Sequence, residues 1–165
     1  MVIVKSIEDV KSNIFNEFSC GNIELDTYLK EFARQNHKKG IGKSFVAFSE
    51  NRVIGYYTLS MACIEFTEIP EGYNRGIPKY PAPVAKIGRL AVQAEFQGKK
   101  IGTALLIDAL KRIVEASKSV GVFAVIVDAK NDSAKRFYDG FGFIPYGKDE
   151  LSLYLPINTV TKLLK

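Results

Sequence analysis

The fold is decided by one stretch of the chain, residues 84–118, which reads VAKIGRLAVQAEFQGKKIGTALLIDALKRIVEASK. Apolar residues dominate its first part and predict a strand over 84–92. A charged turn over 97–100 then leads into residues 101–118, where apolar side chains recur at helical spacing and predict a long helix. A strand that passes through a turn into a helix is a building unit of α/β proteins.

The residues downstream of this stretch extend the α/β pattern. Residues 122–127 are all apolar, which is typical of a strand that helices bury on both faces. Asp132 is placed to cap a helix over 133–141, and residues 151–155 alternate as a last strand. Because a crossover helix joins parallel strands, we expect parallel pairing in the middle of the sheet.

The residues upstream predict two helices. Ser6 and Asp9 fit a capping box, so we expect a short first helix to begin there. Asn22 is placed to cap a second helix that ends near Gly40 and carries one apolar stripe.

Two strands and a long loop connect these helices to the central stretch. Residues 43–49 and 53–64 are rich in β-branched and aromatic residues, and the short break between them predicts a hairpin. Prolines interrupt residues 65–83, which we therefore expect to form a long, partly ordered loop or short edge pairing. The predicted fold is α/β: a mixed sheet with antiparallel N-terminal strands and a parallel central pair, flanked by helices, in one domain over residues 1–165.

The composition is that of an ordinary globular protein. The chain has 165 residues, 47% of them apolar, and a formal charge of +5, which favours an acidic partner such as a nucleotide or RNA. Cys20 and Cys63 are too few for a disulfide scaffold and favour a reducing compartment. No signal peptide or apolar membrane span is visible, so we expect a cytoplasmic protein that does not contact a membrane.

Several familiar active sites are excluded by the residues that the chain lacks. His37 is the only histidine, and it stands beside Lys38 and Lys39 at the polar end of the second predicted helix. A Ser-His-Asp site would have to use this residue, and we do not expect it to be catalytic. The histidine and cysteine spacing provides no zinc site, and no phosphate-binding GxxxxGK[ST] loop is present.

The turn over residues 97–103 has the features of a phosphate site. The first turn of a helix presents unpaired N–H groups and the positive end of its dipole, which together suit a pyrophosphate. Lys99 and Lys100 add positive charge, and Gly102 lets phosphate oxygens approach the backbone. Glycine-rich turns also occur for packing alone, so this pattern by itself leaves both interpretations open.

The same residues resemble the acetyl-CoA site of the GNAT superfamily of N-acetyltransferases, over residues 84–144. The resemblance implies a GNAT-like mixed sheet with acetyl-CoA as acetyl donor and no metal. It implies pyrophosphate binding at a Q/R-x-x-G-x-G/A loop, in which Lys100 here replaces the first glycine. The residues implied to bind the cofactor are Leu90, Ala91, Val92, Gln97, Gly98, Lys99, Lys100, Ile101, Gly102, Thr103, Asn131 and Ala134.

Further motifs resemble one branch of this family, the acetyltransferase toxins of bacterial toxin-antitoxin pairs, over roughly residues 14–156. These motifs are Phe18-Ser19-Cys20-Gly21, Leu25-Asp26 with Leu29, Gly55-Tyr56-Tyr57-Thr58-Leu59-Ser60, Pro81-Ala82-Pro83 and Val127-Asp128-Ala129-Lys130. The resemblance implies that the protein acetylates the α-amine of aminoacyl-tRNA and that a ribbon-helix-helix antitoxin neutralises it. A homodimer is also possible in this branch. The alternatives are a housekeeping GNAT enzyme acting on a protein or small amine, and an inactive domain that binds a nucleotide or RNA.

Tyr138 is the candidate general acid. Acetyl transfer from a thioester needs a proton for the departing thiolate, and a tyrosine with a pKa of about 10 carries one at neutral pH. The resemblance implies this role for Tyr138. The alternative from the residues alone is a core aromatic with a satisfied hydroxyl, since Phe137 and Phe141 are its neighbours.

No general base is evident. The strand over 84–92 contains no carboxylate, and Glu65, Glu68 and Glu71 fall in the predicted loop. An α-amine is about a quarter neutral at pH 7.4, whereas a lysine side chain is only about a thousandth neutral. An enzyme without a base is therefore expected to prefer an α-amine, unless a water chain removes the proton.

Basic residues provide a candidate tRNA surface. Arg89 lies on the predicted cofactor strand and is expected to contact the substrate or an antitoxin. The second predicted helix contributes further positive charge, for which a solvated helix face is the alternative interpretation. The residues predicted to bind substrate are Arg89, Lys30, Arg34, Lys38 and Lys39.

Overall fold

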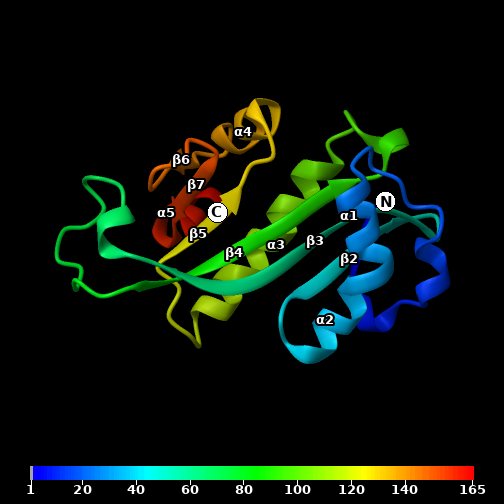
Figure 1. The fold of residues 1–165 in the computed structure, drawn as a ribbon, viewed down its shortest axis with the longest axis horizontal. Helices are drawn as coiled ribbons and strands as arrows, with labels where there is room; N and C mark the ends of the chain where they lie inside the picture. Colours follow the sequence, from blue (N-terminus) through cyan, green and yellow to red (C-terminus); the bar gives the residue numbers. More distant parts are fainter. Residues whose placement is uncertain (1) are drawn as a thin grey trace. The chain divides into compact units, whose positions relative to one another are not determined.

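A computed structural model describes residues 2–165 and shows a mixed α/β fold with one seven-stranded sheet, in the strand order β1-β2-β3-β4-β5-β7-β6. The strands are β1 (Ile3–Ser6), β2 (Lys43–Ser49), β3 (Arg52–Ile64), β4 (Ala82–Val92), β5 (Ala124–Asp128), β6 (Ile144–Pro145) and β7 (Ser152–Pro156). The helices are α1 (Ile23–Thr27), α2 (Ala33–Lys39), α3 (Ile101–Ser117), α4 (Asp132–Asp139) and α5 (Ile157–Leu163) (Figure 1). The predicted α/β class is confirmed.

The chain forms two compact units. The first unit contains Met1–Ser60 and Gly88–Ala109, and the second contains Met61–Ile87 and Leu110–Lys165. Strands β3 and β4 and helix α3 have residues in both units. Each unit has a buried apolar cluster of its own.

The sheet strands of the first unit are antiparallel. Strand β1 pairs with β2, and β2 pairs with β3. Glu50 and Asn51 join β2 to β3 with φ angles of 50° and 65°, so both turn residues are left-handed. Two such residues match the twist of a tight hairpin, and the predicted hairpin is confirmed.

Helices cover both faces of β3 in the first unit. Tyr56 lies on one face and donates from Oη to the carbonyl of Leu25 on α1 at 2.6 Å. Tyr57 lies on the other face and donates to Oδ2 of Asp108 on α3 at 2.5 Å. This arrangement follows from the strand geometry, because successive side chains point to opposite faces.

The second predicted helix is confirmed at both ends but is not a regular α-helix throughout. The Asn22 side chain accepts the N–H of Leu25 at 3.2 Å, and Gly40 ends α2 in the left-handed conformation at a φ of 74°. Between α1 and α2, the stretch η3 (Tyr28–Phe32) has π-helical hydrogen bonding.

The second unit contains the parallel pair that the crossover helix implied. Strand β4 pairs with β5 from Val84–Ala124 to Ile87–Val127. Strand β7 runs antiparallel to β5, and β6 pairs with β7. Tyr154 on β7 lies in the apolar cluster of this unit and is fully buried.

The predicted first helix is wrong. Ser6 ends strand β1 and makes no capping hydrogen bond, and two 3-10 turns, Ile7–Asp9 and Ser12–Phe15, follow it. Ile3–Ser6 pairs with residues 45–48 of β2, so long-range pairing and not a local helix organises this part of the chain.

The predicted capping residue of α4 is also wrong. Asn131 caps the helix, because its Oδ1 accepts the N–H of Ala134 at 2.9 Å, and Asp132 lies in the first turn instead. The short strands β1 and β6 and the C-terminal helix α5 were not predicted. Within residues 2–165 the structure has no helix long and apolar enough to cross a membrane.

Candidate functional site

The turn before α3 has the geometry of an anion site. Gly98 and Lys100 both have left-handed backbones, with φ angles of 79° and 65°, and the side chains of the turn are exposed. The N–H of Ala104 donates to the Lys100 carbonyl at 3.2 Å, so the N–H groups of Ile101 and Gly102 precede that helical bond. These N–H groups, the helix dipole and two lysines fit a pyrophosphate.

Glutamine side chains fasten this turn to the segment before α1. The Gln97 side chain donates from Nε2 to the carbonyl of Cys20 at 2.7 Å and to that of Val92 at 2.9 Å. The buried Gln93 accepts the N–H of Ser19 at 2.9 Å. The amide of Gln97, predicted to bind the cofactor, is therefore used to hold the turn, while its backbone remains part of the site.

The strand residues before the turn are partly open. Leu90 and Val92 are half-buried and Ala91 is buried. The ladder between β4 and β5 ends at the pair Ile87–Val127, so the backbone of these three residues is not part of it. On the β3 side the contact is tight, since a Cβ at Gly55 would lie 2.7 Å from the Ala91 carbonyl oxygen.

Arg89 packs on an aromatic group of the first unit. Its guanidinium carbon lies 3.5 Å from the centre of the Tyr28 ring, a close cation–π contact. Tyr28 is stacked on Tyr56 and on Phe32, each with ring centres 6.5 Å apart. Phe32 is 47% exposed, so this aromatic group reaches the surface.

The basic residues of the second predicted helix differ in their surroundings. Lys30, Lys38 and Lys39 are exposed. Arg34, by contrast, donates to the Val10 carbonyl and lies over the Phe15 ring. Three of the four helix residues predicted to bind substrate are therefore exposed cations, whereas the Arg34 side chain packs against the protein.

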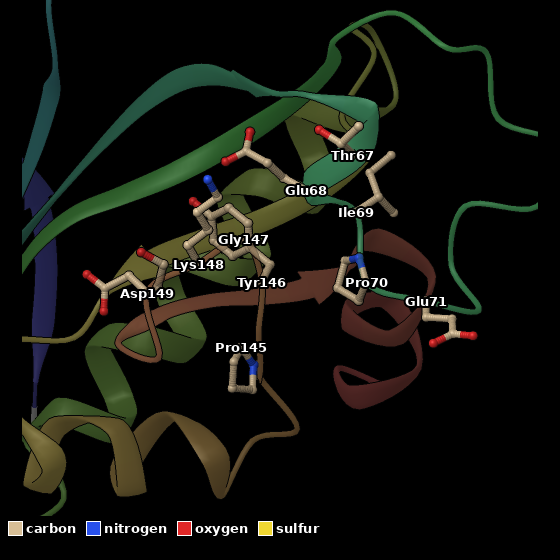
Figure 2. A pocket seen from close by; sticks show the side chains of 11 residues that line it. Thr67, Glu68, Ile69, Pro70, Glu71, Pro145, Tyr146, Gly147, Lys148 and Asp149 are labelled. Atoms are coloured by element: carbon tan, nitrogen blue, oxygen red, sulfur yellow. The ribbon is translucent and has the colours of Figure 1, made fainter.

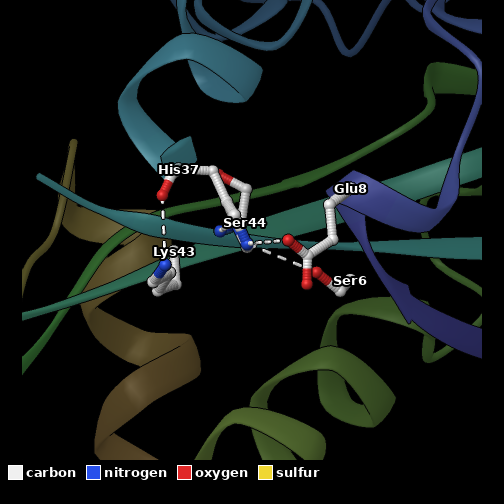
Figure 3. Close-up of polar contacts among 5 residues, drawn as sticks. All are labelled: Ser6, Glu8, His37, Lys43 and Ser44. Carbon is white, nitrogen blue, oxygen red and sulfur yellow. Dashed lines mark hydrogen bonds and ion pairs between the residues drawn. The ribbon is translucent and has the colours of Figure 1, made fainter. Parts of the chain in front are cut away.

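His37 lies in the last turn of α2 beside Lys38 and Lys39, as expected, but its side chain is buried. Figure 3 shows its polar contacts. Its Nδ1 accepts the N–H of Ser44 at 3.0 Å, and Nε2 lies 3.4 Å from the Ser6 hydroxyl and 3.8 Å from Glu8. The imidazole is buried because it lies against Ser6, at the end of strand β1, which was not predicted. Desolvation, followed by the charge of Lys43, lowers the pKa of His37.

Tyr138 lies on α4 in the second unit and is 8% exposed. Its ring packs edge-on against Phe137 and Phe143. Burial raises its pKa to about 12, so the hydroxyl keeps its proton at neutral pH. Among residues 2–165 no protein group hydrogen-bonds to this hydroxyl, and its role as an acid stays a prediction.

Carboxylates of the second unit are engaged with other groups. Asp128, at the end of β5, pairs with Lys86 at 3.1 Å and accepts from the Ser152 hydroxyl at 3.1 Å. Glu68, which follows β3, accepts the N–H of Glu65 at 2.8 Å in a capping box. Neither carboxylate is a free base in this arrangement.

A cavity of about 820 Å³ opens in the second unit between the segment 67–71 and the loop 145–149 (Figure 2). Glu68 and Tyr146 face each other across it, and Asp149 lies on the loop side. Burial, with the charges of Asp128 and Glu68, raises the pKa of Tyr146. The lining of the cavity carries Glu68, Glu71 and Asp149 together with Lys148.

The predicted site residues fall into two groups by unit. Residues 89–103 and the helix lysines lie in the first unit, and Asn131, Ala134 and Tyr138 lie in the second. Sequence reasoning missed Tyr28 and Phe32, whose helical spacing indicated only an apolar stripe. The described residues contain no group of three or more His, Cys, Asp or Glu side chains that could hold a metal.

The mixed α/β fold described above is one that acetyltransferases share. The chain matches the acetyltransferase (GNAT) family over residues 11–143 and belongs to that family. This confirms the resemblance seen in the sequence.

Similar proteins are acetyltransferase toxins. A tRNA-acetylating toxin of Mycobacterium tuberculosis is 35% identical over 161 residues, covering 98% of this chain and 93% of the toxin. The structure of AtaT complexed with acetyl-methionyl-tRNAfMet has a TM-score of 0.90 and 28% identity, with 100% of both chains covered. A mutant AtaT toxin bound to the C-terminus of the antitoxin AtaR and acetyl-CoA has a TM-score of 0.80 and 26% identity, covering 99% of this chain and 97% of that one.

Proposed function

We propose that this protein transfers an acetyl group from acetyl-CoA to the α-amine of an aminoacyl-tRNA and is the toxin of a toxin-antitoxin pair. The observation that carries the proposal is full-length similarity to a tRNA-acetylating toxin, at 35% identity. An N-acetylated aminoacyl group has no free amine for peptide bond formation, so the reaction removes charged tRNA from elongation.

The donor binds at the start of α3. The N–H groups of Ile101, Gly102 and Thr103 receive the pyrophosphate, and Lys99 and Lys100 add positive charge. The left-handed Gly98 and Lys100 support this interpretation, because they turn the backbone before the helix. The backbone of Leu90 to Val92, beyond the β4–β5 ladder, pairs with the extended arm of the donor. Bound acetyl-CoA supplies an activated thioester.

Tyr138 is the general acid. As the C–N bond forms and the C–S bond breaks, its Oη donates a proton to the departing thiolate. The proton that the attacking nitrogen loses passes to solvent, and solvent returns a proton to the tyrosinate. The pKa of about 12 makes it a weak acid toward water but keeps it protonated at every physiological pH. Asn131 supports this role by fixing the start of α4, through its bond to the N–H of Ala134.

The acceptor is an α-amine, which reacts without a base, and the two carboxylates discussed above are both engaged with other groups. Asp128 is paired with Lys86, and Glu68 is used in a capping box. A lysine amine is about a thousandth neutral near pH 7.4 and needs a base, whereas an aminoacyl α-amine is about a quarter neutral. Lys30, Lys38, Lys39 and Arg89 provide the positive surface for the acceptor arm. This substrate places the enzyme in the cytoplasm.

The partner that neutralises the enzyme is a ribbon-helix-helix antitoxin. A mutant AtaT toxin with 26% identity to this chain binds the C-terminus of the antitoxin AtaR, which supports a similar pairing. We further propose that both units serve one acetyltransferase domain, since the family match spans residues of each.

A cell-free translation reaction tests the toxin activity. Protein added with acetyl-CoA is expected to stop peptide synthesis, and fresh charged tRNA added with an acetyl-CoA-depleting enzyme is expected to restore it. Protein without acetyl-CoA is the control and should leave synthesis unchanged. Continued synthesis in the presence of active enzyme and acetyl-CoA would contradict the proposal.

A further inference from the structure

An aromatic side chain, Phe32, lies at the surface of the first unit. Phe32 is 47% exposed, although its stacking partner Tyr28 is only 7% exposed. The two rings are inclined by 28° with centres 6.5 Å apart. They begin and end the π-helical stretch, and π-helical turns inside α-helices are rare and concentrate at functional sites.

Arg89 contributes a cation to the same aromatic group. Its guanidinium lies over the Tyr28 ring, with 3.5 Å between its central carbon and the ring centre. Within residues 2–165 no carboxylate lies within ion-pair distance of Arg89. Stacking uses the flat face of a guanidinium and leaves the N–H groups at its edge available. Arg89 is therefore a positioned, half-buried cation whose charge is not neutralised.

Tyr28 is the common neighbour of an exposed ring, Phe32, and an uncompensated guanidinium, Arg89, and these two groups together match the chemistry of a nucleotide. Aromatic rings stack on bases of any sequence, and the N–H fork of arginine suits a phosphate. An acidic peptide would use the guanidinium but has no need of the exposed ring. The neighbouring Lys30 is exposed and adds positive charge to the same helical segment.

We infer that Phe32 and Arg89 form the binding site for the terminal nucleotide at the 3′ end of the tRNA. The base stacks on Phe32, and the phosphate on its 5′ side accepts hydrogen bonds from Arg89. Tyr28 is a positioning residue that holds both side chains. The inference rests on the proposed function and names the part of the tRNA that this unit binds.

Substitutions of Phe32 test whether its ring binds the nucleotide. Phe32→Leu removes the aromatic ring but keeps apolar volume, and Phe32→Tyr keeps the ring. Phe32→Leu is expected to raise the KM for charged tRNA by about 5- to 150-fold with little change in kcat, because stacking contributes binding alone. Phe32→Tyr is expected to restore the wild-type KM. Acetyl-CoA binding, measured by calorimetry, should be equal in the wild type and both variants. Equal binding is the control that the variants are folded.

A second arm uses uncharged tRNA as a competitive inhibitor, either complete or lacking its terminal adenosine. Loss of the adenosine is expected to weaken inhibition of the wild type by a similar factor and to have no effect on Phe32→Leu. Tyr80→Leu, at an exposed aromatic outside this group, is the matched control and should behave like the wild type.

The outcomes separate the inference from the function on which it rests. An enzyme that acetylates no charged tRNA would overturn the proposed function itself. Acetylation of charged tRNA with equal KM values for the wild type and Phe32→Leu would overturn the nucleotide site alone. Weaker antitoxin binding by Phe32→Leu, with an unchanged KM for tRNA, would also overturn it and would assign the ring to the protein partner.

Discussion

Tyr138 and Tyr154 are both buried tyrosines of the second unit, and burial raises the pKa of each to about 12. They differ in what surrounds the hydroxyl. Tyr154 is 0% exposed, and its hydroxyl has no hydrogen-bond partner among the described residues. Tyr138 retains 8% exposure at the surface of α4. A hydroxyl that keeps its proton and some access suits proton transfer, whereas a sealed one does not.

Tyr138→Phe is expected to lower kcat by about two to four powers of ten, because the leaving thiolate loses its proton donor. Acetyl-CoA binding should be unchanged, since the ring is kept. Single-turnover kinetics and calorimetry on the same protein measure the two effects.

Tyr154→Phe is the matched control for this change. It removes an unsatisfied buried hydroxyl, so kcat should stay at the wild-type value and the free energy of unfolding should stay equal or rise by about 1 kcal/mol. Equal activity losses in both variants would assign Tyr138 to the core.

Lys100 has a backbone conformation that lowers the stability of the protein. It has a left-handed backbone, which costs a residue with a Cβ about 1–2 kcal/mol and costs glycine almost nothing. Lys100→Gly is therefore expected to raise the free energy of unfolding by up to about 1 kcal/mol after the larger chain entropy of glycine is subtracted. Denaturant unfolding measures this change.

Lys100→Ala separates the charge from the backbone. It loses the same ammonium but keeps the left-handed strain, so it should not gain stability. Both variants should bind acetyl-CoA, and any weakening common to the two measures the charge. A Lys100→Gly protein that is less stable than Lys100→Ala would contradict the strained turn.

At the scale of elements, α2 is joined to β1 and β2 through His37. Because Nδ1 accepts the Ser44 N–H, the imidazole is neutral with its proton on Nε2. The pKa of His37 is lowered below its usual 6.5, so the unfolded chain takes up a proton first as the pH falls. Stability from this group is thus present above about pH 6.5 and is lost below it.

His37→Asn tests this pH dependence, since the asparagine oxygen can accept the Ser44 N–H but does not titrate. Below pH 6.5 the free energy of unfolding of the wild type should fall by up to about 1.4 kcal/mol per pH unit more than that of the variant. Parallel curves for the two proteins from pH 7 to pH 5 would show that the imidazole does not set this slope.

Elements with strong local signals could be predicted from the sequence. The stretch 84–118 has an apolar strand followed by apolar side chains at helical spacing. Asn22 and Gly40 mark the ends of a helical segment through their own conformations. Strand β1 could not be predicted, because its pairing with β2 overrides the local capping signal at Ser6. Asn131 and Asp132 are both good capping residues, so spacing alone could not decide between them.

The candidate site was only partly predictable. The turn 97–103 and Tyr138 carry chemistry that residue type and family resemblance point to. The stack of Arg89 on Tyr28 joins residues far apart in the sequence, and the burial of His37 depends on an unpredicted strand. Such contacts follow from tertiary packing, which leaves no local pattern.

At the scale of the whole molecule, the charge of +5 should make tRNA binding depend on salt. Replacing Lys38 and Lys39 with glutamine is expected to flatten the slope of log affinity against log salt by up to about 2 units. Lys162 and Lys165, exposed near the C-terminus, give a control with the same change in net charge. Equal slopes in the two double variants would place the tRNA surface elsewhere.

The central claim is that the acceptor is the α-amine of an aminoacyl-tRNA, and the product identifies the acceptor directly. The protein is incubated with acetyl-CoA, charged tRNA and a lysine-containing peptide whose N-terminus is blocked, at pH 7.4. Nuclease digestion and mass spectrometry then measure the terminal aminoacyl-adenosine. It is expected to gain the mass of one acetyl group while the peptide stays unmodified. An acetylated peptide with unmodified aminoacyl-adenosine would contradict the claim.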